Sequence, residues 1–157
     1  MTTPVRLARE TQSGLFLLDT NIISDLMKGT ASRAAQRGRL AVQEGRVTGV
    51  CTSIVVKCEL LFGLMKRPSM RLQAAYDVEM ARLQVLSLTD DVALHYAFLR
   101  STLEAAGAPI GPNDALIAAH ALALDAILVS ADAEFLRVPG LKVENWLEPY
   151  RESQATP

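Results

Sequence analysis

Cysteine and histidine are scarce in this 157-residue chain, which contains two of each. Cys51 and Cys58 are seven positions apart and form no C-x-x-C pair, so the sequence predicts no disulfide framework and favours a reducing, cytoplasmic environment. We interpret both cysteines as small, buried apolar side chains. Two histidines are poor material for a zinc site, which usually takes its ligands from histidine and cysteine. The composition therefore argues against a small scaffold held together by disulfides or zinc.

Long apolar runs and a charge excess are also missing. Residues 1–14 are polar, and the apolar run that follows them, at 15–18, is too short for a signal-peptide core or a membrane span. The formal net charge of −1 gives no long-range attraction to nucleic acid or membrane, so a polyanionic partner would need a local cationic patch. With 50% hydrophobic and 21% charged residues, the chain is typical of a globular domain. We expect a soluble domain at 15–147, an N-terminal arm at 1–14, a C-terminal tail at 148–157 and no membrane association.

The stretch from Gly111 to Asp132 is the most informative part of the chain. Gly111-Pro112 opens a helix that runs to Leu124, and Asp114 falls in its first turn, where the helix dipole favours a carboxylate. The apolar run 127–129 has the character of a short strand, and Asp132 follows it. If the helix packs antiparallel to this strand, the start of the helix and the end of the strand lie at the same edge of the sheet. Asp114 and Asp132, eighteen positions apart, would then meet.

Strands alternate with helices along the whole chain. This pattern predicts the α/β class, as a three-layer α/β/α sandwich with a central, mainly parallel sheet. We expect five strands, at 15–18, 47–52, 85–88, 127–129 and 142–146. The helices before the one at Gly111 are expected at 22–28, 32–44, from a Ser53 cap to about 66, 70–84 and 90–106, and 136–140 is expected to be a loop.

Four acidic residues stand where such a sheet would gather them. Ligands of parallel sheets bind outside the carboxyl ends of the strands. Asp19 and Asp132 follow strands, Asp114 starts a helix, and Glu59 lies in an apolar helical segment where burial without a partner would be costly. Converging carboxylates repel one another, and a hard divalent cation such as Mg²⁺ or Mn²⁺ relieves that repulsion. Such ions activate water and stabilise the charge that develops during attack on a phosphodiester.

Motifs of other enzyme classes are absent. The sequence contains no P-loop, no G-x-G-x-x-G and no G-x-S-x-G. It does contain a series of segments in a characteristic order: Leu18-Asp19-Thr20-Asn21, Glu59-Leu60-Leu61-Phe62-Gly63, Ile110-Gly111-Pro112-Asn113-Asp114, Ile117-Ala118-Ala119-His120-Ala121, Leu128-Val129-Ser130-Ala131-Asp132, and the ending from Phe135 to Trp146. Through these segments, which span residues 15 to 146, the chain resembles PIN-domain proteins, and more closely the VapC-type toxin ribonucleases of bacterial toxin–antitoxin pairs.

The resemblance implies an Mg²⁺-dependent endoribonuclease, with Mn²⁺ as a possible substitute ion. It implies that Asp19 and Asp114 are the primary metal ligands, and that Glu59 and Asp132 bind a second ion or hold water on the metal. The fourth acid is the most variable position in the family, and Glu134 is a rival to Asp132. The resemblance also implies an RNA substrate, a homodimer, and an antitoxin partner that covers the acidic groove. In this setting Thr20 or Asn21 would orient a ligand or contact the phosphate.

Two other kinds of function remain open at this point. Asp19 after a strand would suit an aspartyl-phosphate phosphatase, but that chemistry usually requires a second acid two residues later, where Asn21 stands. A non-catalytic binding module would keep the fold and hold a partner on an apolar surface. Taken singly, Asp114 is better explained as an acid that complements a helix dipole, and Asp19 as a turn residue. Taken together with Glu59 and the ordered segments, they favour a functional site.

Several other residues have a structural interpretation. His120 lies about 240° around the helix from Asp114, so we expect it to pack in the core, and Trp146 is expected to close the core. Cationic residues are frequent in the segment 28–46, and they fit a solvated helical face and an RNA-backbone contact equally well: Lys28, Arg33, Arg37, Arg39 and Arg46.

Overall fold

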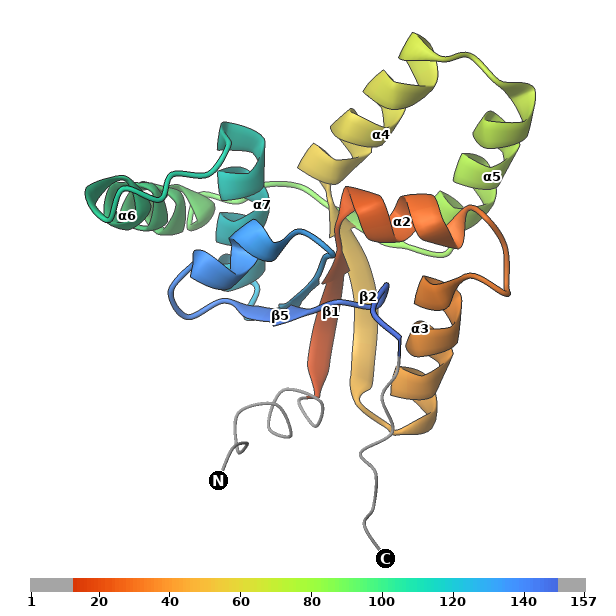
Figure 1. Cartoon of the computed structure of the whole chain (residues 1–157), viewed down its shortest axis with the longest axis horizontal. Coiled ribbons are helices and arrows are strands. Elements are labelled where there is room, and N and C mark those ends of the chain that lie inside the picture. The colour runs from red at the N-terminus through yellow and green to blue at the C-terminus, as the bar shows by residue number, and fades with distance from the viewer. Residues whose placement is uncertain (1–12, 150–157) are drawn as a thin grey trace, which may run out of the picture.

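The computed structural model describes residues 13–149, which form five strands, six α-helices and one 3₁₀ helix (Figure 1). The strands are β1 Gly14–Leu18, β2 Val47–Ser53, β3 Gln84–Leu86, β4 Ile127–Val129 and β5 Lys142–Glu144. The α-helices are α2 Thr20–Leu26, α3 Arg33–Gln43, α4 Ile54–Lys66, α5 Met70–Ala81, α6 Val92–Ala105 and α7 Pro112–Ala123, and the 3₁₀ helix η1 is Ala133–Arg137.

All the strands pair in parallel, in the order β3-β2-β1-β4-β5, and helices flank the sheet (Figure 1). The predicted three-layer α/β/α fold is therefore confirmed. The register aligns Leu18 of β1 with Val129 of β4, and Val129 with Glu144 of β5. As a result the carboxyl ends of the central strands meet at one edge of the sheet, which is where parallel α/β folds place ligands.

The start of α2 differs from the sequence prediction. The helix expected at 22–28 begins already at Thr20, because Asp19 is the N-cap: its backbone is extended, and its carboxylate accepts a hydrogen bond from the Thr20 N–H at 2.8 Å. The prediction of a Ser53 cap on α4 is confirmed, because its hydroxyl accepts from the Val55 N–H. The predicted acid therefore sits at the junction between strand and helix, with its position set by both elements.

Several boundaries differ from the prediction, some because a tertiary contact overrides local preference and one because of a local cap. The helix expected at 70–84 ends at Ala81, since Gln84 already pairs with Cys51 of β2. The last strand ends at Glu144 instead of Trp146, because the Trp146 ring turns inward and packs on Phe16 with ring centroids 5.6 Å apart. The 3₁₀ helix η1 begins before the loop expected at 136–140 and takes its first residues, since the Asp132 carboxylate caps it by accepting from the Glu134 N–H at 2.9 Å.

Most expectations about the core are confirmed. His120 and Trp146 are 1% and 3% exposed, and the His120 Nδ1 lies 2.8 Å from the Ser53 hydroxyl. Burial lowers the pKa of His120 below its ordinary value, so this ring is a neutral core group. Cys51 is buried as expected, whereas Cys58 is exposed because it lies on the outer side of α4.

The terminal segments of the domain prediction are mostly outside the described residues. The expected arm at 1–14 includes residues 1–12, and the expected tail at 148–157 includes 150–157. Within the described part Gly14 already belongs to β1, one residue earlier than expected. Across residues 13–149 no helix has both the length and the apolar character that a bilayer crossing demands.

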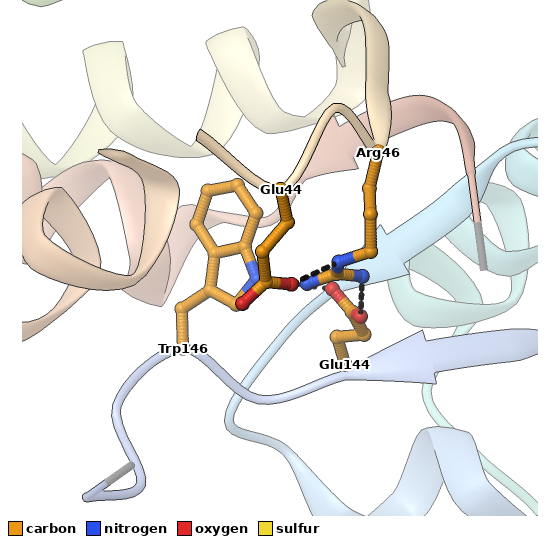
Figure 2. Close-up of polar contacts among 4 residues, drawn as sticks. All are labelled: Glu44, Arg46, Glu144 and Trp146. Atoms are coloured by element: carbon orange, nitrogen blue, oxygen red, sulfur yellow. Dashed lines mark hydrogen bonds and ion pairs between the residues drawn. The ribbon is translucent and has the colours of Figure 1, made fainter. Parts of the chain in front are cut away.

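Arg46 forms a largely buried ion-pair network with Glu44 and Glu144 (Figure 2). Its guanidinium contacts the Glu144 carboxylate at 2.6 Å and the Glu44 carboxylate at 2.9 Å, and Glu144 also accepts a hydrogen bond from the Trp146 Nε1 at 3.1 Å. Arg46 is 8% exposed. Of the two alternatives left open for Arg46, an RNA-backbone contact is therefore disfavoured, since its guanidinium is paired with the buried Glu144 and the more exposed Glu44.

Replacing Arg46 with methionine should destabilise the fold by about 3–5 kcal/mol, because Glu144 would remain buried without its cation. Urea unfolding followed by circular dichroism measures this change. Lys142→Met is the control: Lys142 pairs with Asp125 at 3.1 Å, but both side chains are well exposed, so its removal should cost under about 1 kcal/mol. Equal effects of the two substitutions would contradict a structural role for the buried network.

Candidate metal centre

Three carboxylates converge at the carboxyl edge of the sheet. Asp114 in the first turn of α7, Asp132 after β4 and Glu134 in η1 each place one carboxylate oxygen within 4.8 Å of the others. The predicted meeting of Asp114 and Asp132 is confirmed. Glu134, which we treated as a rival to Asp132, lies beside it instead, because η1 turns both side chains towards the same helix start.

Asp19 approaches this group from the end of β1. It is 5% exposed, and its backbone N–H donates to the Val129 carbonyl at 3.0 Å, which ties it to β4. Burial raises the pKa of Asp19, and the charges of Glu59 and Asp132 raise it further, while hydrogen bonds from Ser130 and Thr20 lower it. The net rise shows that dehydration and repulsion exceed the stabilisation that the hydrogen bonds supply.

Glu59 reaches the same edge from α4. Its carboxylate accepts a hydrogen bond from the Thr20 hydroxyl at 2.5 Å, so a residue of α2 orients an acid of α4. Glu59 is half-buried, which resolves the difficulty of an acid in an apolar helical segment. Thr20 thus contacts Glu59, one of the four acids that the sequence singled out.

Ser130 is the polar residue that sequence reasoning missed. It is 2% exposed and donates a hydrogen bond of 2.7 Å to Asp19 Oδ2, while its oxygen accepts from the Asp132 N–H at 3.1 Å. Asn21 closes the network, because its amide group contacts both Asp19 and Ser130 and its carbonyl accepts from the Ala131 N–H. A signal was present in the sequence: Ser130 follows a buried strand directly, as Asp19 does.

The pKa of Asp114 reflects the combined charge of the neighbouring acids. Burial and the four nearby carboxylates of Asp19, Asp132, Glu59 and Glu134 raise its pKa to about 6. These acids offer only carboxylate oxygens as ligands, and their mutual repulsion makes ionisation of Asp114 unfavourable. Such a group suits a hard divalent cation, because the cation attracts the charges that otherwise repel one another. Asp19, Glu59, Asp114, Asp132 and Glu134 therefore have the chemistry to hold such an ion.

The remaining cations of segment 28–46 contact the protein itself. Arg33 and Arg37 donate to the backbone carbonyls of Leu147 and Glu148, each at 3.1 Å. Arg39 donates to the Thr30 carbonyl at 2.8 Å, and Lys28 pairs with Asp25 at 3.3 Å. Two of these arginines therefore hold the segment after β5 against α3.

The sequence comparisons agree with this geometry. The family model described as "PIN domain" matches residues 16–141. The chain is 33% identical over 135 residues to Ribonuclease VapC1 of Haemophilus influenzae, an alignment that covers 84% of this chain and 98% of that protein. It is 31% identical over 134 residues to the tRNA(fMet)-specific endonuclease VapC of Salmonella typhimurium, which covers 83% and 97% of the two chains.

The fold comparison gives the same result. The crystal structure of VapBC2 from Rickettsia felis bound to a DNA fragment from its promoter matches with a TM-score of 0.76 and 31% sequence identity. That match covers 85% of this chain and 99% of the other chain. Fold, family model and relatives of nearly the same length coincide over the residues that carry the acidic group. The chain belongs to the PIN-domain family, and within it to the VapC proteins.

Proposed function

We propose that this protein is a divalent-metal-dependent endoribonuclease that acts as the toxin of a toxin–antitoxin pair. The observation that carries the proposal is the convergence of Asp114, Asp132 and Glu134 within 4.8 Å, with Asp19 and Glu59 acting electrostatically on the same group. The ribonuclease names of the related VapC proteins support it. Mg²⁺ is the expected ion, with Mn²⁺ as a substitute, and the cytoplasm is the expected location.

Each side chain has a distinct role in this proposal. Asp19 and Asp114 hold the ion directly, whereas Glu59, Asp132 and Glu134 hold a second ion or orient water and the phosphate. When bound, the ion activates water and stabilises the negative charge of the phosphate under attack. Thr20 and Asn21 act on the ligands: the Thr20 hydroxyl fixes Glu59, and the Asn21 amide fixes Asp19. We propose that Ser130 has a similar role, because its hydroxyl donates to an oxygen of Asp19.

The alternatives raised by the sequence have less support. A phosphatase with Asp19 as nucleophile needs a second acid two residues later in the chain. Asn21 stands at that position, where its side chain contacts Ser130 and accepts a hydrogen bond from the Ala131 N–H. A non-catalytic module gives no reason for five acids to share one edge of the sheet.

The expected antitoxin partner would cover or invade the acidic groove, and we propose that it also occupies a separate apolar groove beside α3. Side chains of α3, β2 and the segment after α5 line this groove, with Trp146 at one wall: Ala35, Val42, Val50, Leu83 and Trp146. Val42 is 61% exposed in the chain alone, so an apolar segment of the partner would bury it. The VapBC complexes that share this fold support an antitoxin partner. The homodimer expected from the family is also a proposal, and light scattering on the isolated chain tests it.

Asp114→Asn should reduce RNA cleavage by more than about 100-fold while the fold remains intact, because the substitution removes a ligand oxygen charge. Cleavage of a labelled RNA in Mg²⁺ and calorimetric titration with Mn²⁺ measure activity and ion binding. Asp125→Asn is the matched control, since Asp125 is exposed and lies in a left-handed conformation that asparagine also tolerates. Cleavage that persists in Asp114→Asn protein would refute the proposal, and a wild type that binds no ion would favour the binding module.

Ser130→Ala should raise the Mg²⁺ concentration that half-saturates cleavage by roughly 10–100-fold, because Asp19 would lose the hydrogen bond that orients it. The maximal rate at saturating Mg²⁺ should fall much less. Ser32→Ala is the control. It also removes a serine hydroxyl that forms a hydrogen bond, but Ser32 caps α3 and does not contact the acids. An unchanged Mg²⁺ requirement would show that Ser130 only fills space.

Val42→Asp should abolish binding of the cognate antitoxin without lowering stability, because it places a charge in the apolar groove on a side chain that is already exposed. Co-expression with the antitoxin and purification through a tag on this chain measure the effect. Met70→Asp introduces the same charge at a 93% exposed position outside the groove and should leave the complex intact. Retention of the antitoxin by the Val42 variant would exclude this groove.

A further inference from the structure

A pocket of about 230 Å³ opens directly beside the acidic group. Its lining comes from the segment after β4, from η1, from the end of β5 and from α3, and includes Arg37, Asp132, Leu136, Glu144, Asn145 and Glu148. Asp132 belongs both to this pocket and to the carboxylate cluster. A molecule whose reacting phosphate lay at the acids would therefore have its neighbouring group at the mouth of this pocket.

The walls combine apolar surface with hydrogen-bond donors. Leu136 is 55% exposed and supplies an apolar face. The Asn145 side-chain oxygen accepts from the Leu147 N–H at 2.9 Å, which fixes the amide and leaves its NH₂ group as the part that donates to a ligand. Arg37 reaches the pocket from α3, and its guanidinium already donates to the Glu148 carbonyl at 3.1 Å. A nucleobase matches this combination, because it is a flat ring with polar edges and is linked to a phosphate.

The lining repels a phosphate less strongly than a count of its carboxylates indicates. Three acids line the pocket, but Glu144 is paired with Arg46 at 2.6 Å and hydrogen-bonded to Trp146, as Figure 2 shows. Asp132 faces the proposed metal, and Glu148 is exposed at the rim. Arg37 is therefore the cation of this lining that is in position to meet a phosphate, a role for which a guanidinium is well suited.

We propose that this pocket is a nucleotide subsite, which holds one base next to the phosphodiester that is cut. In it the base packs on Leu136 and accepts a hydrogen bond from Asn145, and Arg37 contacts the adjoining phosphate. The inference rests on the proposed endoribonuclease function and deepens it. A base enters such a pocket only when it is unstacked and unpaired, so the substrate is RNA that is single-stranded at the cut. The subsite then contributes to the choice of cutting position.

Arg37→Gln and Leu136→Ala test the subsite, with Arg33→Gln as the matched control. Arg33 and Arg37 lie one helical turn apart on α3 and make equivalent hydrogen bonds to the backbone after β5, but only Arg37 lines the pocket. Each protein is incubated with Mg²⁺ and single-stranded RNA randomised around a fixed centre, and the product ends are sequenced. We expect both test variants to lose about tenfold in kcat/KM, a typical result of losing one contact to the RNA. In Leu136→Ala the base preference at one position flanking the cut should also flatten. Arg37→Gln, which loses a phosphate contact, should keep the wild-type preference, and Arg33→Gln should match the wild type in both respects.

Two results would overturn the subsite while the proposed function stands. The first is wild-type base preference in Leu136→Ala, and the second is the same loss of kcat/KM in Arg33→Gln as in Arg37→Gln, which would trace the effect to a loosened backbone. If the wild type shows no Asp114-dependent cleavage, the proposed function fails, and the pocket is judged by binding alone. The full chain is then titrated with each of the four nucleoside 5′-monophosphates in Mg²⁺ and followed by amide chemical shifts. Shifts at Leu136 and Asn145 that Arg37→Gln abolishes would uphold a nucleotide site, and their absence would refute it.

Discussion

Repulsion between carboxylates at one edge of a parallel sheet is the constraint on which the rest of this structure depends. The strands end in register, so Asp19 and Asp132 are carried to the same edge, and α7 begins there with Asp114. Burial and mutual repulsion raise the pKa of Asp114 to about 6, so bringing these charges together costs free energy. The packing of the rest of the fold offsets this cost, and a bound cation would reduce it.

The fold restrains the acids with neutral hydrogen-bond donors and keeps its buried cation elsewhere. Ser130, Thr20 and Asn21 donate to the carboxylates without cancelling their charge, so the site remains attractive to a metal. Arg46, by contrast, is placed on Glu144, where it neutralises an acid that takes no part in the cluster. This division keeps the electrostatic potential at the edge negative while the end of β5 packs firmly on the core through Trp146.

Local signals in the sequence predicted the elements that carry the site. Pro112 after Gly111 marked the start of α7, and the apolar runs at β1 and β4 marked buried strands, because chain stiffness and hydrophobic pattern act over a few residues. The errors lie where a distant partner decided the outcome. The helix expected to reach Gln84 ends at Ala81, because Gln84 pairs with Cys51 of β2. Trp146 lies outside the last strand, because its ring packs on Phe16.

By itself the sequence determined the fold class and the order of the acids, since alternation of strands and helices permits few arrangements and each acid follows a strand or belongs to a helix. Tertiary structure alone decided which side chains support and neutralise them. Ser130 reaches Asp19 across 111 positions of the chain, and Arg46 reaches Glu144 across 98. No local pattern encodes such pairs, because each depends on the exact register of strands and on which side chains burial deprives of water.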